Sequence, residues 1–281
     1  MSSGEIILLG AVAGFTIFLG LPIGRLRNPA PRIRALLNAT AIGILLFLFW
    51  DVLTGAIEPV ESAVTDAADH GGSWLKVVGL GATMTAGVAI GLLSLVYYER
   101  WLDQRVAQRP AGPGAQVAAS RRAGLIDSLS EPHRLAFFIA LGIGLHNFSE
   151  GLAIGQSAAS GEISLAVLLI IGFGLHNATE GFGIVAPMTA AGERPTWAFL
   201  GLMGLIGGGP TFAGTIIGQA WVNDWLFIAF LALAAGSILY VVMELLGVAK
   251  KLDMKDVLCW GILLGLFLGF ATDMVLVAAG A

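Results

Sequence analysis

The hydrophobic positions of this 281-residue chain gather into long apolar runs, separated by short polar segments. A helix of about 20 apolar residues crosses the roughly 30 Å hydrocarbon core of a bilayer, and a helix satisfies its own backbone hydrogen bonds there. The pattern therefore predicts an all-α polytopic membrane protein with eight transmembrane helices. The predicted spans cover residues 5–24, 36–57, 75–98, 133–158, 163–188, 196–218, 225–247 and 256–279.

Basic residues concentrate in alternate connections between these spans. All 15 Lys and Arg residues except Lys76 fall in or at the edges of the first, third, fifth and seventh connections. The second connection is acidic and carries Glu58, Glu61, Asp66 and Asp69. Loops rich in Lys and Arg stay in the cytoplasm, so this distribution predicts that both termini lie outside it. The alternation also supports an even number of spans.

Composition narrows the class of protein further. Hydrophobic residues make up 57% of the chain and charged residues only 12%, a balance too apolar for one soluble core. The single Cys259 excludes an intramolecular disulfide and a Cys-based zinc motif. Glu5 stands where a cleavable signal peptide would carry basic residues, so we expect no such peptide. We expect one transmembrane domain over residues 1–281, with a flexible cytoplasmic loop at about 99–132.

The strongest polar signal is a motif that occurs twice, in the fourth and fifth spans. Residues 142–155 read GIGLHNFSEGLAIG, and residues 172–185 read GFGLHNATEGFGIV. On an α-helix the His, Asn and Glu of each copy fall within one arc of roughly 100°. Two antiparallel helices that face each other through these arcs would form a metal site. Its candidate residues are His146, Asn147, Glu150, His176, Asn177 and Glu180.

Both motif copies lie near the middle of their spans. His146 follows Arg134 by 12 residues, which is about 18 Å along a helix, and His176 lies at a similar depth on the return span. The copies therefore meet at the midplane on oppositely directed helices. This predicts an inverted-repeat arrangement centred on spans four and five, which transporters use to place a substrate site halfway across the membrane.

Two Glu side chains at mid-membrane need a neutralising partner. An ionised Glu at the centre of a span costs about 2.5–3.5 kcal/mol, and no Lys or Arg of the predicted spans lies at that depth. A divalent cation fits, because two carboxylates balance its charge and two imidazoles supply nitrogen ligands. The alternative is structural, with each His–Glu pair as an i, i+4 hydrogen bond that ties helices together. Duplication of the whole triplet at matching depth favours the metal site.

At these residues the chain resembles the ZIP (Zrt-/Irt-like) family of divalent-metal transporters, particularly its bacterial members. HNFSEGLAIG is similar to the fourth-span pattern HNxPEG of that family, HNATEGFGI to its fifth-span counterpart, and GSILYVVMELL to its seventh span. The resemblance implies uptake of zinc, iron, manganese, cobalt or cadmium ions into the cytoplasm, as substrate rather than as a catalytic cofactor. It also implies a homodimer in a bacterial inner membrane, with spans one, four, five and six moving against the others.

The chain also departs from the family pattern. Ser149 and Thr179 replace the Pro that usually precedes each motif Glu, which removes the basis for the helix kinks those prolines imply. Asn177 stands where several relatives carry Asp, and Gly209 stands where a Glu commonly precedes Pro210. Relatives with those acids can hold two adjacent metal ions. We therefore expect one ion in this chain.

Other polar and flexible positions give weaker signals. The run of glycines before Pro210 predicts close helix approach and a local break in span six. Asp51 and Asp273, in the outer parts of spans two and eight, are candidate entrance residues, although water-exposed positions are the preferred interpretation. Glu244, near the cytoplasmic end of span seven, could guide an ion outward or simply reach water.

Three classes of function remain open at this point. The leading hypothesis is a divalent-metal transporter whose partners are metal ions and the lipid bilayer, without nucleic acid. The second is an intramembrane metal-dependent hydrolase that uses the same ion to activate water. The pattern HNxxE argues against it, because Asn occupies the place of the general base in HExxH. The third is a metal sensor or receptor that uses the site for structure.

Overall fold

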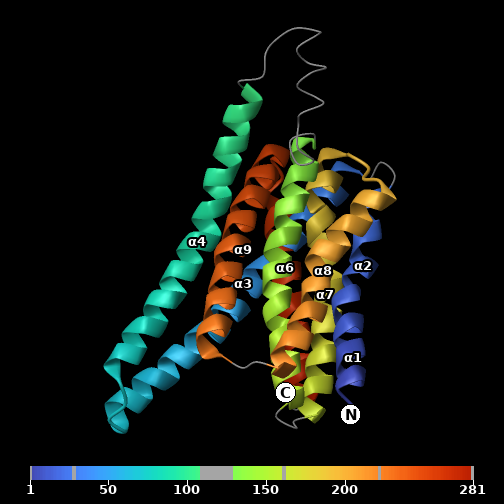
Figure 1. The fold of residues 1–281 in the computed structure, drawn as a ribbon. Coiled ribbons are helices and arrows are strands. Elements are labelled where there is room, and N and C mark those ends of the chain that lie inside the picture. The colour runs from blue at the N-terminus through green and yellow to red at the C-terminus, as the bar shows by residue number, and fades with distance from the viewer. Residues whose placement is uncertain (1, 27–29, 108–128, 160–162, 221–222, 280–281) are drawn as a thin grey trace.

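The computed structural model is a bundle of long helices with no strand in its described residues (Figure 1). It describes residues 2–26, 30–107, 129–159, 163–220 and 223–279; within the helices, a few side chains, that of His176 among them, lie outside the description. The elements are α1 (Ser3–Phe15), α2 (Ile17–Gly20), the 3₁₀ helix η1 (Leu21–Arg25), α3 (Pro31–Asp69), α4 (Trp74–Ala107), α6 (Glu131–Ala159), α7 (Ile163–Ala191), α8 (Trp197–Ala220), α9 (Asp224–Leu252) and α10 (Lys255–Ala279).

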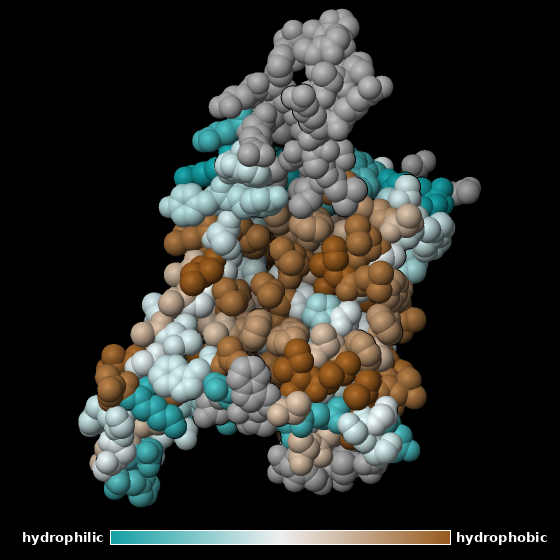
Figure 2. Space-filling model, in the orientation of Figure 1, coloured by the Kyte–Doolittle hydropathy of each residue, from teal (hydrophilic) through white to brown (hydrophobic). Residues whose placement is uncertain are grey.

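The predicted membrane fold is confirmed. Seven helical segments of the described chain are long and apolar enough to cross a membrane, and the 29-residue α7 covers the remaining predicted span. Apolar side chains form a broad band between two polar ends of the molecule (Figure 2). Both termini lie at one end of the bundle, while the last turns of α4 and the first turns of α6 lie at the other (Figure 1). An even number of passes follows; which end faces the cytoplasm stays a prediction.

The first span is divided rather than continuous. α1 ends at Phe15, and Thr16 then bonds through Oγ1 to the carbonyl of Ala13 at 2.6 Å. Pro22 lies in the first turn of η1, which follows α2 directly. A hydroxyl that competes for a backbone carbonyl bends a helix, and Pro has no N–H to donate. The Ala13 carbonyl also accepts a hydrogen bond from a side chain of another helix, Asn177 Nδ2 at 3.0 Å.

The predicted break in span six does not occur, because α8 continues through Pro210. The predicted close approach is present on both sides of this helix. A Cβ added to Gly208 would collide with the carbonyl of Gly14 in α1, and one added to Gly214 would collide with the carbonyl of Phe148 in α6. Pro inside a helix costs about 3 kcal/mol. Packing against two backbones holds α8 helical in spite of that cost.

α3 and α4 are longer than their predicted spans. α3 ends at Asp69 rather than near residue 57, and α4 ends at Ala107 rather than near residue 98. Hydropathy detects the part of a helix that lies in lipid, whereas the polar ends of these helices lie beyond it. The predicted loop at 99–132 therefore begins later than expected, and its residues 108–128 lie outside the described part of the chain.

Three helices, α3, α6 and α9, lie at the centre of the bundle. The most apolar stretches of α3, α6 and α9 are 61%, 72% and 61% buried, against 17% for α4 and for α10. The main cluster of buried apolar side chains joins α3, α6, α7 and α9. The two helices that carry the motif copies thus lie in the interior, where polar groups need partners from the protein.

Candidate metal centre

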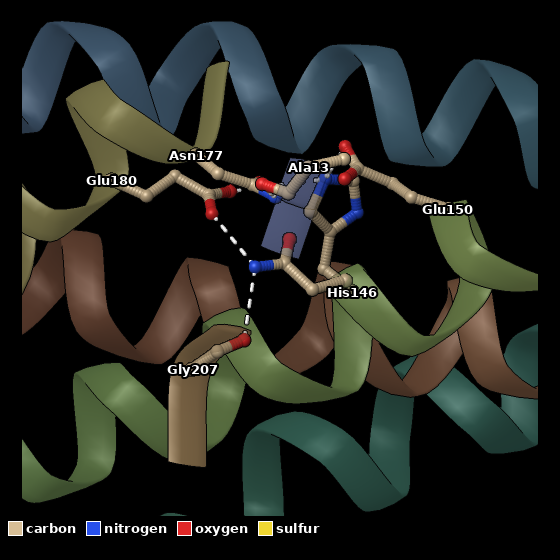
Figure 3. Close-up of polar contacts among 7 residues, drawn as sticks. Ala13, His146, Glu150, Asn177, Glu180 and Gly207 are labelled. Carbon is tan, nitrogen blue, oxygen red and sulfur yellow. Dashed lines mark hydrogen bonds and ion pairs between the residues drawn. The ribbon is translucent and has the colours of Figure 1, made fainter. Parts of the chain in front are cut away.

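The two motif copies lie side by side near the middle of α6 and α7, which are each 29 residues long. All the motif side chains that the structure describes are buried: His146, Asn147, Glu150, Asn177 and Glu180. Figure 3 shows the labelled members gathered between the helices. The structure therefore brings these five residues of the two copies together, while the inverted-repeat arrangement stays a prediction.

Direct contacts link one copy to the other. Asn147 donates from Nδ2 to Glu180 Oε2 at 2.9 Å. His146 Nε2 lies 3.0 Å from Glu150 Oε1 on its own helix and 4.0 Å from Glu180 Oε1 on α7. The i, i+4 pair of the structural alternative is thus present in the first copy. The carboxylate of Glu180 goes beyond that alternative, because it joins the imidazole and the amide of the other helix.

The two Asn side chains occupy similar positions relative to their neighbours. Asn147 also donates from Nδ2 to the carbonyl of Gly207 in α8, and Asn177 donates from Nδ2 to the carbonyl of Ala13 in α1, each at 3.0 Å. In both, Oδ1 has no hydrogen-bond partner among the described residues. A buried acceptor without a donor is costly. Each amide therefore presents an oxygen that a cation would satisfy.

The repeat also includes the Gly that follows each motif Glu, and the packing shows why a Gly is needed there. A Cβ added to Gly151 would collide with the carbonyl of Thr211 in α8. A Cβ added to Gly181 would collide with the carbonyl of Ile17 in α2. Both positions need a residue without a side chain, because the backbones approach so closely. The repeat thus encodes close packing as well as polar groups.

The structure does not complete the predicted ligand set. The described His, Cys, Asp and Glu side chains form no group of three that could hold a metal ion by themselves. His176 belongs to α7, but its side chain lies outside the described residues. What the described residues supply is an excess of acceptors: two carboxylates, two amide oxygens and an imidazole. This chemistry suits a divalent cation, and the six-residue set stays a prediction.

A cavity of about 490 Å³ reaches the centre from one side. Its wall includes His146 and Glu150 on α6, Asp51 on α3 and Asp273 on α10. Asp51 interacts electrostatically with His146, Glu150 and Asp273. Asp51 is exposed and Asp273 is half-buried, which agrees with the preferred interpretation of water-exposed positions, and their role as entrance residues stays a prediction. In the sequence, the signal for these two residues was that each is an acid inside an apolar span.

Comparison with known proteins gives a consistent answer. A family model described as ZIP Zinc transporter matches residues 108–277, which contain both motif copies. Proteins named zinc transporter ZupT from Salmonella newport (strain SL254), Salmonella typhimurium (strain LT2) and Salmonella typhi are each 31% identical to this chain over 267 residues. That alignment covers 92% of this chain and 92% of each relative. On this evidence the chain belongs to the ZIP zinc transporter family, whose members are transporters of metal ions rather than enzymes.

Proposed function

We propose that the chain carries divalent transition-metal ions, zinc first among them, into the cytoplasm through one mid-membrane site. The proposed ligands are the His, Asn and Glu of both copies: His146, Asn147, Glu150, His176, Asn177 and Glu180. One observation carries the proposal. Two buried carboxylates from different helices meet beside a buried imidazole, and no Lys or Arg is among the buried residues of the described chain.

The ligand chemistry supports a transition metal. Imidazole suits zinc, iron and cobalt, whereas magnesium and calcium prefer oxygen ligands alone. A site with two carboxylates and two imidazoles therefore favours zinc and similar ions. The ZupT relatives are named as zinc transporters, which supports zinc among these candidates.

The cavity supports the direction of transport. On α3 it extends from Asp51 to Glu58, toward the end of the bundle where the termini lie. The basic connections lie at the opposite end, so the positive-inside rule places the cavity outside the cytoplasm. Acidic walls raise the local concentration of cations. Zinc would thus enter from outside, through the acidic cavity.

The cytoplasmic side of the proposed site is packed with apolar side chains. Ile139 and Ile143 on α6 and Ile238 on α9 are fully buried there. An ion bound at the centre therefore needs a rearrangement before it can leave. Close backbone contacts join α1, α2, α6, α7 and α8 around the site. We infer that these helices move together against α3, α4, α9 and α10, as the family resemblance implies.

Location and assembly complete the proposal. The bacterial relatives support a place in the inner membrane. The basic connections support a topology with both termini outside the cytoplasm. The homodimer that the resemblance implies stays a prediction, and so does the single transmembrane domain over residues 1–281. The hydrolase hypothesis has no support from the relatives, whose names describe transport.

The test is zinc uptake into sealed proteoliposomes that contain the purified chain. We expect accumulation for the wild type and none above protein-free liposomes for Glu150→Gln or Glu180→Gln, with no hydrolysed product. Glu131→Gln is the matched control, because this Glu lies on α6 with a side chain 79% exposed. Normal uptake by both buried Glu variants would contradict the mid-membrane site.

A further inference from the structure

One polar side chain beside the metal centre has no place in the proposed ligand set. Ser149 is 1% exposed, and its Oγ has no hydrogen-bond partner among the described residues. It lines the same cavity as His146, Glu150 and Ala153. These four positions follow the i, i+3, i+4, i+7 spacing of one helix face. The hydroxyl therefore faces the cavity from α6.

The orientation of this hydroxyl differs from that of four other buried Ser and Thr side chains, although Thr211 Oγ1 also has no hydrogen-bond partner among the described residues. In a helix interior such hydroxyls commonly bond to a carbonyl one turn earlier. Thr189 donates from Oγ1 to the carbonyl of Val185 at 3.1 Å, and Ser237 donates from Oγ to the carbonyl of Leu233 at 2.8 Å. Ser149 makes no such bond. Its oxygen is thus available to whatever occupies the cavity.

Two carboxylates face the cavity together with Ser149. Glu150 contacts His146 through Oε1, while its Oε2 has no hydrogen-bond partner among the described residues. Asp51 lines the cavity from α3 and interacts electrostatically with Glu150. In Figure 3 the Glu150 carboxylate lies beside the His146 imidazole, and the Glu150 backbone lies on the side away from Glu180. A hydroxyl and two carboxylates therefore border the space that leads to the centre.

We propose that Ser149 Oγ is an oxygen ligand of the divalent ion as it arrives from the cavity, with Glu150 Oε2 and the Asp51 carboxylate as its anionic neighbours. This receiving position rests on the proposed function, because it passes the same ion to the same mid-membrane site. Its ligands are all oxygens, which hold harder ions and do not retain soft ones. The His146 imidazole lies against Glu150, with Nε2 3.0 Å from Oε1, so an ion held by these oxygens is next to a nitrogen ligand of the mid-membrane site.

The experiment exchanges this oxygen for sulfur. Ser149→Cys is made in a Cys259→Ser background, because Cys259 is an exposed thiol that would bind added metal itself. Cadmium is titrated into the purified full-length protein, and the ultraviolet cadmium–thiolate absorption is followed. Thiolate binds soft ions strongly. We expect the absorption to appear and the cadmium Kd to fall by about tenfold. Substitutions around a metal ion change its affinity by about 10- to 100-fold, and this is the lower end of that range.

Ser237→Cys in the same background is the matched control. Its hydroxyl is buried but already bonded within α9, so we expect no cadmium–thiolate absorption there. A second variant, Ser149→Ala, removes the oxygen alone, and we expect the KM of zinc uptake to rise by about tenfold. The proposal is overturned if Ser149→Cys binds zinc, shows no new absorption and leaves the cadmium Kd unchanged. It is equally overturned if Ser149→Ala leaves KM unchanged.

These outcomes separate the receiving position from the proposed function. Glu180→Gln reports on the mid-membrane site, because Glu180 does not line the cavity. If Glu180→Gln abolishes uptake while both Ser149 variants behave as the wild type, only the role of Ser149 is wrong. If Glu180→Gln transports zinc normally, the mid-membrane site is wrong and the receiving position has no site to serve.

Discussion

Asn147 donates a hydrogen bond from Nδ2 to Glu180 Oε2 at 2.9 Å, and through it the amide of one motif copy orients the carboxylate of the other. The same Nδ2 also reaches the carbonyl of Gly207, so one amide joins three helices. This arrangement leaves Oε1 of Glu180 toward His146, at 4.0 Å from Nε2. The position of the carboxylate is therefore determined by a group that is itself a proposed ligand.

Replacement of the Asn147 side chain should weaken zinc binding by more than the loss of folding stability accounts for. Asn147→Ala leaves two buried acceptors without their donor, which costs about 1–3 kcal/mol each, and it frees the Glu180 carboxylate. Asn38→Ala is the control, since Asn38 is a buried amide that donates to the carbonyl of Leu245 at 3.2 Å, away from the site. Zinc Kd and Tm are measured for both. Equal zinc affinity in the two variants would contradict the role given to Asn147.

Two glycines of α7 should respond differently to the same added methyl group. Gly181→Ala places a Cβ against the carbonyl of Ile17, and we expect a loss of about 1–3 kcal/mol, as for overpacked cores, together with loss of uptake. Gly183→Ala meets nothing within 4 Å and should raise helix stability by up to about 1 kcal/mol. Thermal unfolding in detergent measures both. If Gly181→Ala were as stable as Gly183→Ala, the close approach of α2 and α7 would be wrong.

Zinc affinity should decrease as the pH falls from about 8 to about 5. Imidazole and carboxylate bind a metal ion only after losing their protons, so protons compete with zinc at His146, Glu150 and Glu180. Zinc binding therefore releases protons, so it is favoured at higher pH. Calorimetry in buffers of different ionisation enthalpy measures the number released. Binding without proton release across this range would show that these groups are not the ligands.

The orientation of the bundle can be tested by labelling. A cysteine introduced at Ala115, which lies outside the described residues, should react only with reagents on the cytoplasmic side. A cysteine at Asp66, near the end of α3, should react only from outside. Both are made in a Cys259→Ser background, and an impermeant thiol reagent is applied to intact cells and to inverted vesicles. Reaction of both positions from one side would overturn the eight-span topology.

The wild type should hold one tightly bound ion per protomer at the centre. Two adjacent divalent ions repel strongly and need several carboxylates between them, whereas Glu150 and Glu180 supply two. Asn177 is neutral and uses its Nδ2 on the carbonyl of Ala13. Gly209 has open space at its Cβ position, with nothing within 4 Å. The chain thus has room for a further acid there but does not carry one.

Metal analysis and anomalous scattering measure the number of ions that each protomer binds. The variant that combines Asn177→Asp with Gly209→Glu should gain a second ion close to the first, because it adds two carboxylates. The structure leaves open space for the one at position 209. The single variants serve as controls. Two ions bound to the wild type would contradict this prediction.

Much of the fold was predictable because membrane insertion depends on local hydropathy. The spans and the meeting of the two motif copies follow from apolar runs and from a repeat that can be read along the chain. The division at Thr16 and the continuity of α8 through Pro210 were not predictable in this way. Both depend on which backbone packs against the segment, and sequence periodicity does not contain that information.

The candidate site shows the same limit. The motif Asn residues could be named from the sequence, but their backbone partners, Ala13 and Gly207, come from helices that no spacing rule connects to them. Asp51 and Asp273 were visible as acids within apolar spans. Their common cavity depends on the relative rotation of α3, α6 and α10, which hydropathy alone does not determine.

The long α3–α4 pair, which extends the molecule at the end where the termini lie, has a practical consequence (Figure 1). A small membrane protein has little mass outside lipid, and this lack of features hinders particle alignment in electron microscopy. The turn at Gly71 and Gly72 joins two helices beyond the apolar band and is solvent-exposed. An antibody fragment raised against this tip would provide a fiducial for imaging.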